Sequence, residues 1–367
     1  MMRPVLFFLS LTLMAGGVRA QSEDGSDQAD FAAYSQFDFV AGKKVLFYDD
    51  FSAALTKWKV IEYDQSDDGE APGVKNIANQ NALWFKTPRR GLFYPLSINA
   101  LPDEFTVEFD MWADLDRMSE MESGLILSFV ANRVNKNEYN TAFDEHPQIQ
   151  LDIHPSSEML YCTATRQAGT DPRELDKKQI QNGWKAGQVQ RVSISRNKTH
   201  IKLYVNEKKF IDLPNGLPTA TAYTLVMATN LWGDGLYVTD FKLAQGFPPA
   251  PKMEGGKFVT NAIYFDVNSA HIKPQSRAAL SQAAAAINSV QGKVVIVGHT
   301  DSDGAEEANL ALSKRRAEAI KQLLTKEFTI DAARLLTDGK GEGAPIDTNT
   351  TAEGKANNRR VEFVQVK

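Results

Sequence analysis

Three segments near the end of the 367-residue chain decide its C-terminal fold: GHTD at 298–301, NLALSKRRA at 309–317 and NRRVEF at 358–363. The first follows KVVIV at 293–297, whose β-branched run predicts a buried strand. The second lies within 306–328, where leucine and isoleucine recur at helical spacing. The third leads into alternating apolar residues, so the segments together predict a strand, a helix and a closing strand.

Two further elements are expected before these segments. Asn261–Phe265 is short and apolar and predicts a first strand. Pro274 suits the first turn of a helix, and the residues after it place one apolar face at Leu280, Ala283, Ala284 and Ile287. The closing strand is expected at Arg360–Val366. Residues 257–367 therefore predict a small α/β domain with a βαβαβ core.

A charged pair flanks the turn between the second strand and the second helix. Asp301 lies just beyond the strand, where ligands commonly bind in open α/β sheets. Asn309, Ser313 and Arg316 follow at i, i+4 and i+7, so they share one stripe of the helix. Such an acid and base can converge on one ligand of mixed charge. Each also has a structural explanation, because Asp301 can cap the helix and Arg316 can be a solvated surface base.

The order of these motifs resembles the OmpA-like peptidoglycan-binding domain of bacterial cell envelopes, over the whole C-terminal region. That resemblance implies a ligand, the meso-diaminopimelate of a peptidoglycan stem peptide, whose distal carbon carries an amine and a carboxylate. It implies that Asp301 holds the ammonium and that Arg316 holds the carboxylate in a two-pronged bond. It also implies supporting contacts from Asn268, Asn309 and Arg359.

The larger region, 38–245, is patterned mostly as strands. Clear alternation or hairpin pairing occurs at FTVEFDMWA 105–113, QIQLDIH 148–154, VSISRNKTHIKLYV 192–205 and YVTDFKLA 237–244. These features predict an all-β antiparallel sandwich. VLFYDDFS at 45–52, RVSISRNKTHIKLYVNEKKFIDLP at 191–214 and VTDFKLA at 238–244 resemble the concanavalin A-like jelly roll of laminin-G-like and glucanase domains.

The sandwich raises the question of enzymatic activity. Some jelly-roll glucanases carry catalytic carboxylates as E-x-D-x-x-E on one strand, and Glu108 and Asp110 match the first two positions. The third position holds Ala113, and a carboxylate pair at i, i+2 also occurs on ordinary solvated strand faces. We therefore expect a binding module.

The five tryptophans are expected to pack mostly in the core, with Trp112 and Trp232 as surface candidates for stacking on a sugar.

The remaining segments predict export. Residues 1–20 have a positive start, an apolar run and small residues near a cleavage position, which is typical of a secretory signal peptide. Residues 21–37 are polar and acidic and predict a flexible leader. Residues 246–256 hold three prolines and three glycines and predict a linker. No later stretch is apolar enough to span a membrane, so no transmembrane span is expected in the mature chain. A single cysteine, Cys162, excludes an intramolecular disulfide.

Charge and residue spacing argue against several other functions. The formal net charge is −5, and its acidic excess lies before residue 257, which gives no basic footprint for nucleic acid. DSDG at 301–304 lacks the further ligand that a calcium loop has before its glycine, and the five histidines show no paired spacing. We expect no metal and no cofactor.

The sequence thus predicts a non-catalytic cell-envelope protein of the periplasm that binds peptidoglycan through its C-terminal domain. The sandwich is expected to present a second surface for a glycan or an envelope protein, with contact to the outer membrane. The alternative is a wall-anchored glycoside hydrolase that uses the sandwich.

Overall fold

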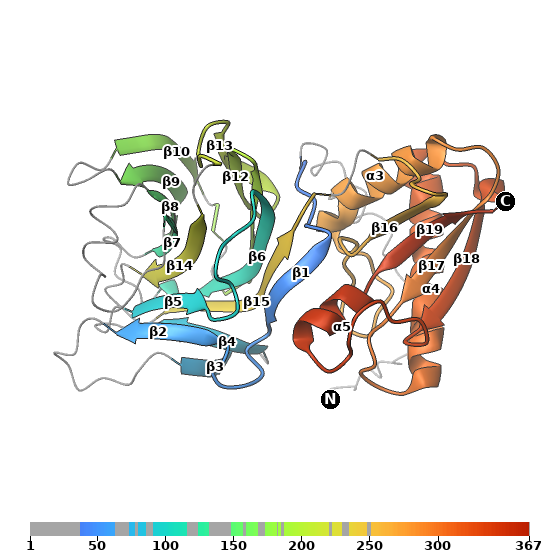
Figure 1. The fold of residues 1–367 in the computed structure, drawn as a ribbon, viewed down its shortest axis with the longest axis horizontal. Coiled ribbons are helices and arrows are strands. Elements are labelled where there is room, and N and C mark those ends of the chain that lie inside the picture. The colour runs from blue at the N-terminus through green and yellow to red at the C-terminus, as the bar shows by residue number, and fades with distance from the viewer. Residues whose placement is uncertain are drawn as a thin grey trace, which may run out of the picture.

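The structure, a computed structural model, places a β-sandwich beside a smaller α/β domain (Figure 1). It describes residues 37–62, 73–77, 80–85, 91–115, 124–131, 148–156, 159–167, 173–181, 183–184, 187–219, 222–229, 235–247 and 251–366. The predicted signal peptide and all but the last residue of the predicted leader lie outside these ranges. Within these ranges, no helix combines the length and apolar character needed to cross a membrane.

Two antiparallel sheets form the sandwich, which confirms the prediction for this region. The first sheet comprises β1 (Lys44–Asp49), β3 (Gly73–Ile77), β4 (Gln80–Phe85), β6 (Glu104–Ala113), β11 (Gln190–Asn197), β12 (His200–Val205), β13 (Lys208–Leu213) and β15 (Leu236–Gln245). Its order is β13-β12-β11-β6-β15-β4-β3, with β1 also paired to β15. The second sheet comprises β2 (Trp58–Glu62), β5 (Gly91–Pro95), β7 (Leu125–Ala131), β8 (Gln148–Pro155), β9 (Met159–Gln167), β10 (Arg173–Gln181) and β14 (Tyr223–Thr229). Its order is β10-β9-β8-β7-β14-β5-β2.

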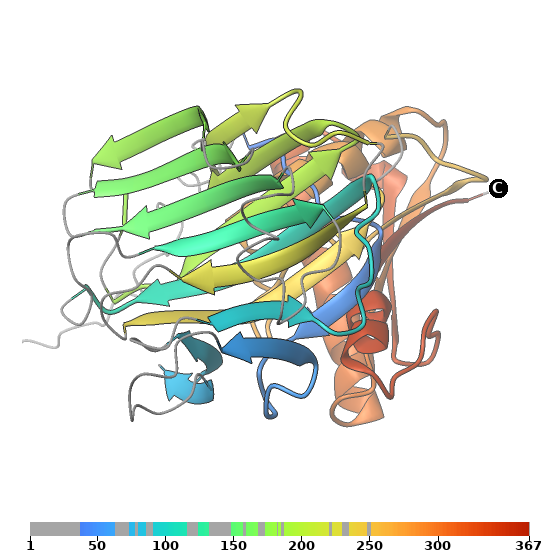
Figure 2. The same ribbon diagram turned by 60° about the vertical axis from the view of Figure 1, so that its left-hand side comes forward.

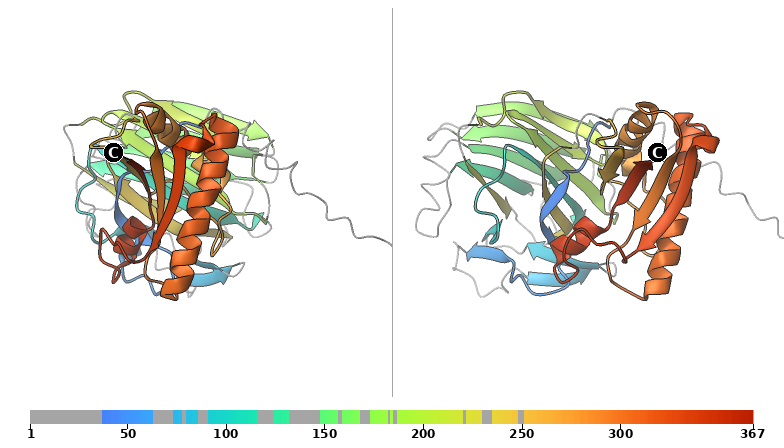
Figure 3. Two further views of the ribbon diagram at one scale, coloured as in Figure 1. Left: turned by 90° about the vertical axis from the view of Figure 1, so that its right-hand side faces the viewer. Right: turned by 45° about the vertical axis from the view of Figure 1, so that its right-hand side comes forward.

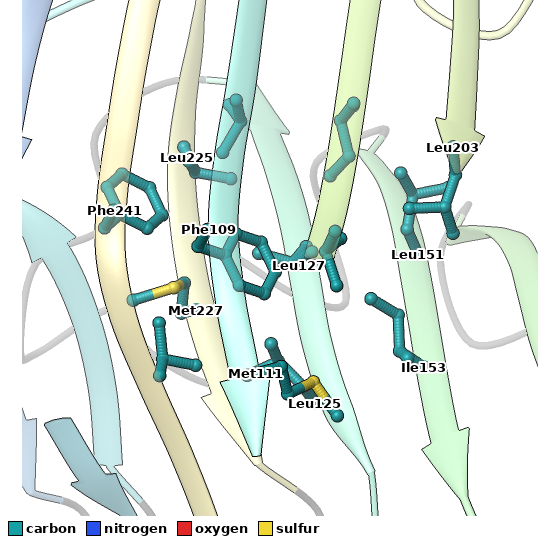
Figure 4. Close-up of a cluster of buried hydrophobic side chains, with 14 of the residues drawn as sticks. Phe109, Met111, Leu125, Leu127, Leu151, Ile153, Leu203, Leu225, Met227 and Phe241 are labelled. Atoms are coloured by element: carbon teal, nitrogen blue, oxygen red, sulfur yellow. The ribbon is translucent and has the colours of Figure 1, made fainter. Parts of the chain in front are cut away.

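The core of the sandwich lies between the two sheets and follows the alternation in the sequence. The inward residues of β6 are Phe105, Val107, Phe109 and Met111, and all four are fully buried. Figure 4 shows Phe109 beside Leu127 and Met111 beside Leu125, and both leucines belong to the opposite sheet. The predicted hairpin is β11–β12, paired from Val192–Val205 to Asn197–His200. Because these positions alternate in a two-residue period, one face of each strand is removed from water.

The tryptophans of the described residues are mostly core residues, as predicted. Trp58, Trp84 and Trp184 are buried. Trp112 is half-buried and packs against Tyr237, with ring centroids 5.0 Å apart. Trp232 lies outside the described residues.

The C-terminal domain is a four-stranded sheet with helices. Its elements are β16 (Lys257–Thr260), the 3-10 turn η4 (Pro274–Ser276), α3 (Arg277–Asn288), β17 (Val294–His299), α4 (Glu306–Phe328), the 3-10 turn η5 (Ala332–Arg334), β18 (Leu335–Gly341), α5 (Ala352–Asn358) and β19 (Val361–Gln365). The sheet order is β16-β19-β17-β18, in which only β17 and β18 run parallel. The α/β class is confirmed.

Three details of this domain differ from the sequence prediction. The first strand is β16 at Lys257–Thr260, before the predicted segment Asn261–Phe265, of which only Phe265 forms an isolated bridge. Strand β18 was not predicted, because its sequence LLTDGKG is polar and rich in glycine. Helix α5 was not predicted either, because its seven residues, AEGKANN, carry no apolar period.

Helix α4 lies along one face of the sheet (Figure 3), and its backbone closely approaches two glycines of that sheet. A Cβ added at Gly298 of β17 would overlap the carbonyl oxygen of Ser313 on α4. A Cβ added at Gly339 of β18 would overlap the Ser313 hydroxyl. Glycine is therefore required at both positions for this approach. The approach fixes the helix against the end of β17, where Asp301 follows.

The two domains share a buried boundary. The seven-stranded sheet faces the viewer in Figure 2, with the C-terminal domain behind the sandwich, against the eight-stranded sheet. One apolar cluster joins the core of the C-terminal domain to Tyr204 of β12 and to four residues before β1: Phe37, Phe39, Val40 and Ala41. Val45 of β1 and Ala244 of β15 pack against Ala356 of α5.

Buried charges also lie at this boundary. Glu108 of β6 is 1% exposed and contacts Lys242 at 2.9 Å and Arg191 at 3.2 Å, and it accepts a 2.7 Å hydrogen bond from the Tyr264 hydroxyl. Burial raises the pKa of Glu108, but Lys242 and Arg191 more than offset this effect and hold it below its ordinary value. Glu108 is therefore not solvated, and the interpretation of the Glu108–Asp110 pair as part of a solvated strand face is wrong for Glu108.

Candidate ligand-binding site

Asp301 lies directly after β17 and is only 8% exposed. Its Oδ2 accepts a 2.6 Å hydrogen bond from Nη1 of Arg359, and its Oδ1 accepts a 3.1 Å bond from the backbone of Asp303. An ionised carboxylate offers about four acceptor positions. Positions on Asp301 therefore remain for a further donor, such as the ammonium of a ligand.

Arg316 lies on α4 and is held by the loop that follows the Phe265 bridge. Its Nε donates to the carbonyl of Ser269 at 2.9 Å, and its guanidinium lies over the Phe265 ring, 4.6 Å from the centroid. A longer contact of 3.4 Å joins Nη2 to the carbonyl of Asp266. Nη1 makes no hydrogen bond within the described residues. One edge of this guanidinium is therefore fixed and the other is available to a ligand.

The charges of Arg316, Arg359 and Asp301 act on one another. Burial lowers the pKa of Arg316, the cation of Arg359 lowers it further, and Asp301 acts in the opposite direction. Arginine nevertheless stays protonated in proteins. The three side chains therefore lie near enough for their charges to act on one another, with two cations and one anion supplied by α4, by the end of α5 and by the end of β17.

Arg359 directly follows α5, and its guanidinium contacts residues of both domains. Its only hydrogen bond within the described residues goes to Asp301, and its guanidinium lies 5.4 Å from the ring centroid of Tyr48 on β1. Burial disfavours the charge of Arg359, but Tyr48 and Asp301 raise its pKa above the ordinary value. Its side chain is 39% exposed, so its unused donors can reach a ligand.

The two asparagines implied by the resemblance have different positions. Asn309 is buried, and its Nδ2 donates to the carbonyls of Asp301 at 3.2 Å and Asp303 at 3.0 Å, and to Oε2 of Glu342 at 2.6 Å. It therefore holds the loop that presents Asp301. Asn268 is exposed, has a left-handed backbone with φ 55°, and lies in the loop whose carbonyls bind Arg316.

This arrangement can bind a zwitterionic group. Asp301 can accept from an ammonium, while the free edges of Arg316 and Arg359 can donate to a carboxylate. Among the residues that the structure describes, no group of three or more His, Cys, Asp and Glu side chains is placed to hold a metal ion.

Two neighbours of the site were not found from the sequence. Glu342 follows the unpredicted strand β18, and a lone glutamate in a glycine-rich segment carries no signal. Tyr48 belongs to the other domain, and only the packing of β1 on α5 brings it to Arg359. No spacing or motif in the sequence could have indicated that contact.

Comparisons with known proteins match the C-terminal domain. The model of the OmpA family matches residues 264–359. "Outer membrane protein A" of Bordetella avium is 44% identical over 117 residues, which are 31% of this chain and 59% of that protein. The "Peptidoglycan-associated lipoprotein" of Pseudomonas putida is 35% identical over 100 residues, which are 27% of this chain and 60% of that protein. The chain thus spans about three fifths of the length of each relative.

One solved structure is similar to the part of this chain that forms the sandwich. The carbohydrate recognition domain of Emp46p in its potassium-bound form matches 56% of this chain and 95% of its own, with 11% identity and a TM-score of 0.41.

Proposed function

We propose that the C-terminal domain, of which the OmpA family model matches residues 264–359, binds peptidoglycan non-covalently by holding the free end of diaminopimelate. The relative from Pseudomonas putida is named for its association with peptidoglycan, which supports this assignment. The observation that carries the proposal is the convergence of Asp301, Arg316 and Arg359 from three separate elements on one site.

The ligand chemistry matches the site group by group. The distal ammonium of diaminopimelate would bind Asp301, and the neighbouring carboxylate would bind the free donors of Arg316 and Arg359. Each charge-assisted hydrogen bond in a partly dehydrated site contributes about 1.5–3 kcal/mol. Asn268, exposed beside Arg316, would add a polar contact at the rim. Asn309 would act indirectly, because its amide holds the Asp301 loop.

A binding assay on the full chain tests this proposal. Isolated peptidoglycan should retain the wild-type protein, and retention should fall strongly for Asp301→Asn and for Arg316→Met. Arg315→Met is the matched control, because Arg315 is the exposed neighbour of Arg316 on α4. Titration calorimetry with free meso-diaminopimelate should show the same order. Equal retention of all four proteins would exclude this site.

We propose that the protein is not an enzyme. The carboxylate that best matched a glucanase, Glu108, is buried beneath the C-terminal domain and paired with Lys242 and Arg191. A glycan could reach it only if the domains separated. A release assay on common glucans should therefore show no turnover with the wild-type chain, and turnover that Glu108→Gln abolishes would support the hydrolase alternative.

The second surface that we propose on the sandwich lies on the seven-stranded sheet. The eight-stranded sheet is covered in part by the C-terminal domain, whereas the seven-stranded sheet lies on the opposite side (Figure 2). Its outer face carries Gln150, Asp152 and Tyr161, all partly exposed. A glycan array and a crosslinking screen should report a glycan or an envelope protein whose capture Asp152→Ala reduces; unchanged capture would exclude this face.

The names of the relatives support a place in the cell envelope. One is an outer membrane protein and the other is a peptidoglycan-associated lipoprotein. We propose that this chain is exported to the periplasm and lies at the cell wall, near the outer membrane. Fractionation of cells should recover it with the envelope, and recovery with the cytoplasm would contradict the proposal.

A further inference from the structure

We infer that the sandwich completes the site, with Tyr48 of β1 as a positioning residue that holds Arg359 for the ligand. This inference rests on the proposed function of the C-terminal domain, because Arg359 is assigned there to the carboxylate of diaminopimelate. It adds a residue from outside the matched region 264–359, and it makes the site a composite of both domains.

The first step is the seating of β1 on α5. The backbone of Val45 donates to Oδ1 of Asn357 at 2.9 Å, and the backbone of Tyr48 donates to Oε1 of Glu353 at 3.1 Å. Glu353 also pairs with Lys57 of the sandwich at 3.2 Å. Helix α5 therefore satisfies two backbone donors of β1, and it is fixed immediately before Arg359.

The second step is the orientation of the Tyr48 ring. The guanidinium of Arg359 lies over the ring at 5.4 Å, within the range of a cation–π contact. At its other end, the Tyr48 hydroxyl donates to Oδ1 of Asp240 at 2.8 Å. Burial and the charge of Asp240 raise the pKa of Tyr48 above its ordinary value, so the hydroxyl keeps its proton. The ring is thus held at its far end and in contact with Arg359 on its face.

The third step is the fixation of Asp240. The pairing of β15 with β6 shifts register between Thr239 and Lys242, and Asp240 there has a positive φ of 50°. Such a bulge re-aims side chains out of a regular strand. Oδ2 of Asp240 accepts from Arg191 at 2.9 Å, and Arg191 also contacts Glu108. A chain of ion pairs and hydrogen bonds therefore leads from Glu108 and Arg191 through Asp240 to Tyr48, whose ring contacts Arg359.

A second branch of the same chain reaches Arg316. Glu108 accepts from the hydroxyl of Tyr264, and the chain after Tyr264 forms the loop whose Ser269 carbonyl binds Arg316. Both cations of the site are therefore joined to one buried cluster in the sandwich. The contacts that dock the two domains therefore also position the groups that hold Arg359 and Arg316.

The expected effect on ligand binding follows from preorganisation. Without the ring, Arg359 would keep only its bond to Asp301, and a flexible side chain would have to be ordered when the ligand binds. A cation–π contact at a partly buried position contributes enough to change the affinity about 3- to 10-fold. Tyr48→Leu should weaken the binding of meso-diaminopimelate by about this factor. Tyr48→Phe keeps the ring and should restore most of the affinity.

The test uses the full chain with calorimetry against meso-diaminopimelate and NMR of the Arg359 side chain. Tyr94→Leu, on β5 of the other sheet, is the matched control and should bind as the wild type does. The Nε–Hε resonance of Arg359, assigned with Arg359→Lys, should be shifted by the Tyr48 ring in the wild type and should lose this shift in Tyr48→Leu. This second readout needs no ligand.

The outcomes separate the inference from the function on which it rests. Weak binding by Tyr48→Leu, rescue by Tyr48→Phe and loss of the ring shift support the inference. Unchanged affinity of Tyr48→Leu, while Asp301→Asn loses binding, overturns the inference and leaves the proposed function standing. If the wild type binds no diaminopimelate, the proposed function fails and NMR decides the positioning. If Tyr48→Leu does not fold, the wild-type resonance decides, since an unshifted Arg359 signal overturns the contact.

Discussion

The guanidinium of Arg359 donates a 2.6 Å hydrogen bond to the carboxylate of Asp301, which joins the end of α5 to the loop after β17. Asp301 is nearly buried, so this contact narrows the directions from which a ligand can approach it. Arg316 on α4 lies near enough for the charge of Asp301 to oppose the lowering of its pKa by burial, but its hydrogen bonds within the described residues go to the carbonyls of Ser269 and Asp266. A ligand of the proposed site would therefore bind between the Asp301–Arg359 pair and the guanidinium of Arg316.

Replacement of Arg316 by lysine should show whether geometry matters beyond charge. Lysine keeps the positive charge but cannot both bond Ser269 and offer a two-pronged edge to a carboxylate. We expect the affinity for meso-diaminopimelate to fall about tenfold, the loss of roughly one charged hydrogen bond. Arg315→Lys is the control, and equal calorimetric affinities of the two variants would refute a directional role.

Removal of the charge of Glu108 should destabilise the protein strongly. Glu108→Gln leaves Lys242 and Arg191 at the domain boundary with less compensation. Breaking a buried pair in this way costs about 3–5 kcal/mol. Urea unfolding should therefore shift to lower concentration. Glu104→Gln, at the start of the same strand, should change little, and similar midpoints for the two variants would contradict the prediction.

Gly298→Ala should disturb both stability and ligand binding. The new Cβ would overlap the Ser313 carbonyl oxygen, and a backbone atom cannot turn aside as a side chain can. Overpacking of this kind costs about 1–3 kcal/mol, and the displaced helix would carry Arg316 away from Asp301. Gly343→Ala is the control, because its Cβ would meet only the Lys340 carbonyl at 3.3 Å. Thermal unfolding of both variants measures the difference, and equal melting temperatures would show that α4 adjusts freely.

Stability should depend on pH through two residues of β8. Burial raises the pKa of Asp152 from 3.8 to about 6, and burial lowers the pKa of His154 from 6.5 to about 4. The folded protein holds the Asp152 proton longer than the unfolded chain does, so stability falls as pH rises from 3.8 to 6. His154 behaves in the opposite way, because the unfolded chain binds its proton at a higher pH than the folded protein does. The contribution of His154 to stability therefore rises as pH rises from 4 to 6.5.

These opposite slopes can be separated by substitution. The contributions of Asp152 and His154 should nearly cancel in the wild type from pH 4 to 6, so the slope of each variant is measured relative to the wild-type profile. Asp152→Asn should leave stability rising with pH by about 1–3 kcal/mol, and His154→Gln should leave it falling by a similar amount. Urea unfolding at several pH values measures both slopes, and parallel profiles for the three proteins would show that neither group is perturbed.

The sequence predicted strands and helices well where apolar residues recur with a regular period. Phe105, Val107 and Phe109 alternate because one face of β6 meets the opposite sheet. Helix α4 begins and ends at the predicted residues, Glu306 and Phe328, because its apolar period is long and regular. Strand β18 and helix α5 escaped prediction because each is short and held by tertiary contacts with little pattern of its own.

The site was predictable only within one domain. Asp301 directly follows a predicted strand, and Arg316 lies within a predicted helix. The local pattern of each element therefore indicates where these two residues lie in the fold. The partner of Arg359 on the sandwich, Tyr48, is set by how two surfaces meet. The same limit applies to Glu108. A polar residue that alternates with core residues is predicted to be solvated, and the sequence does not show that another domain covers it.

The aromatic segment before β1 affects how the protein would transmit force. Phe37 and Phe39 pack on Tyr204 of the sandwich, in one cluster with the core of the C-terminal domain. The predicted linker at 246–256 makes a second, covalent connection. Two separate attachments restrain rotation that one flexible tether would allow. If the C-terminal domain is held to the cell wall, the sandwich would keep a fixed direction relative to it, and a pull on either domain would load both attachments together.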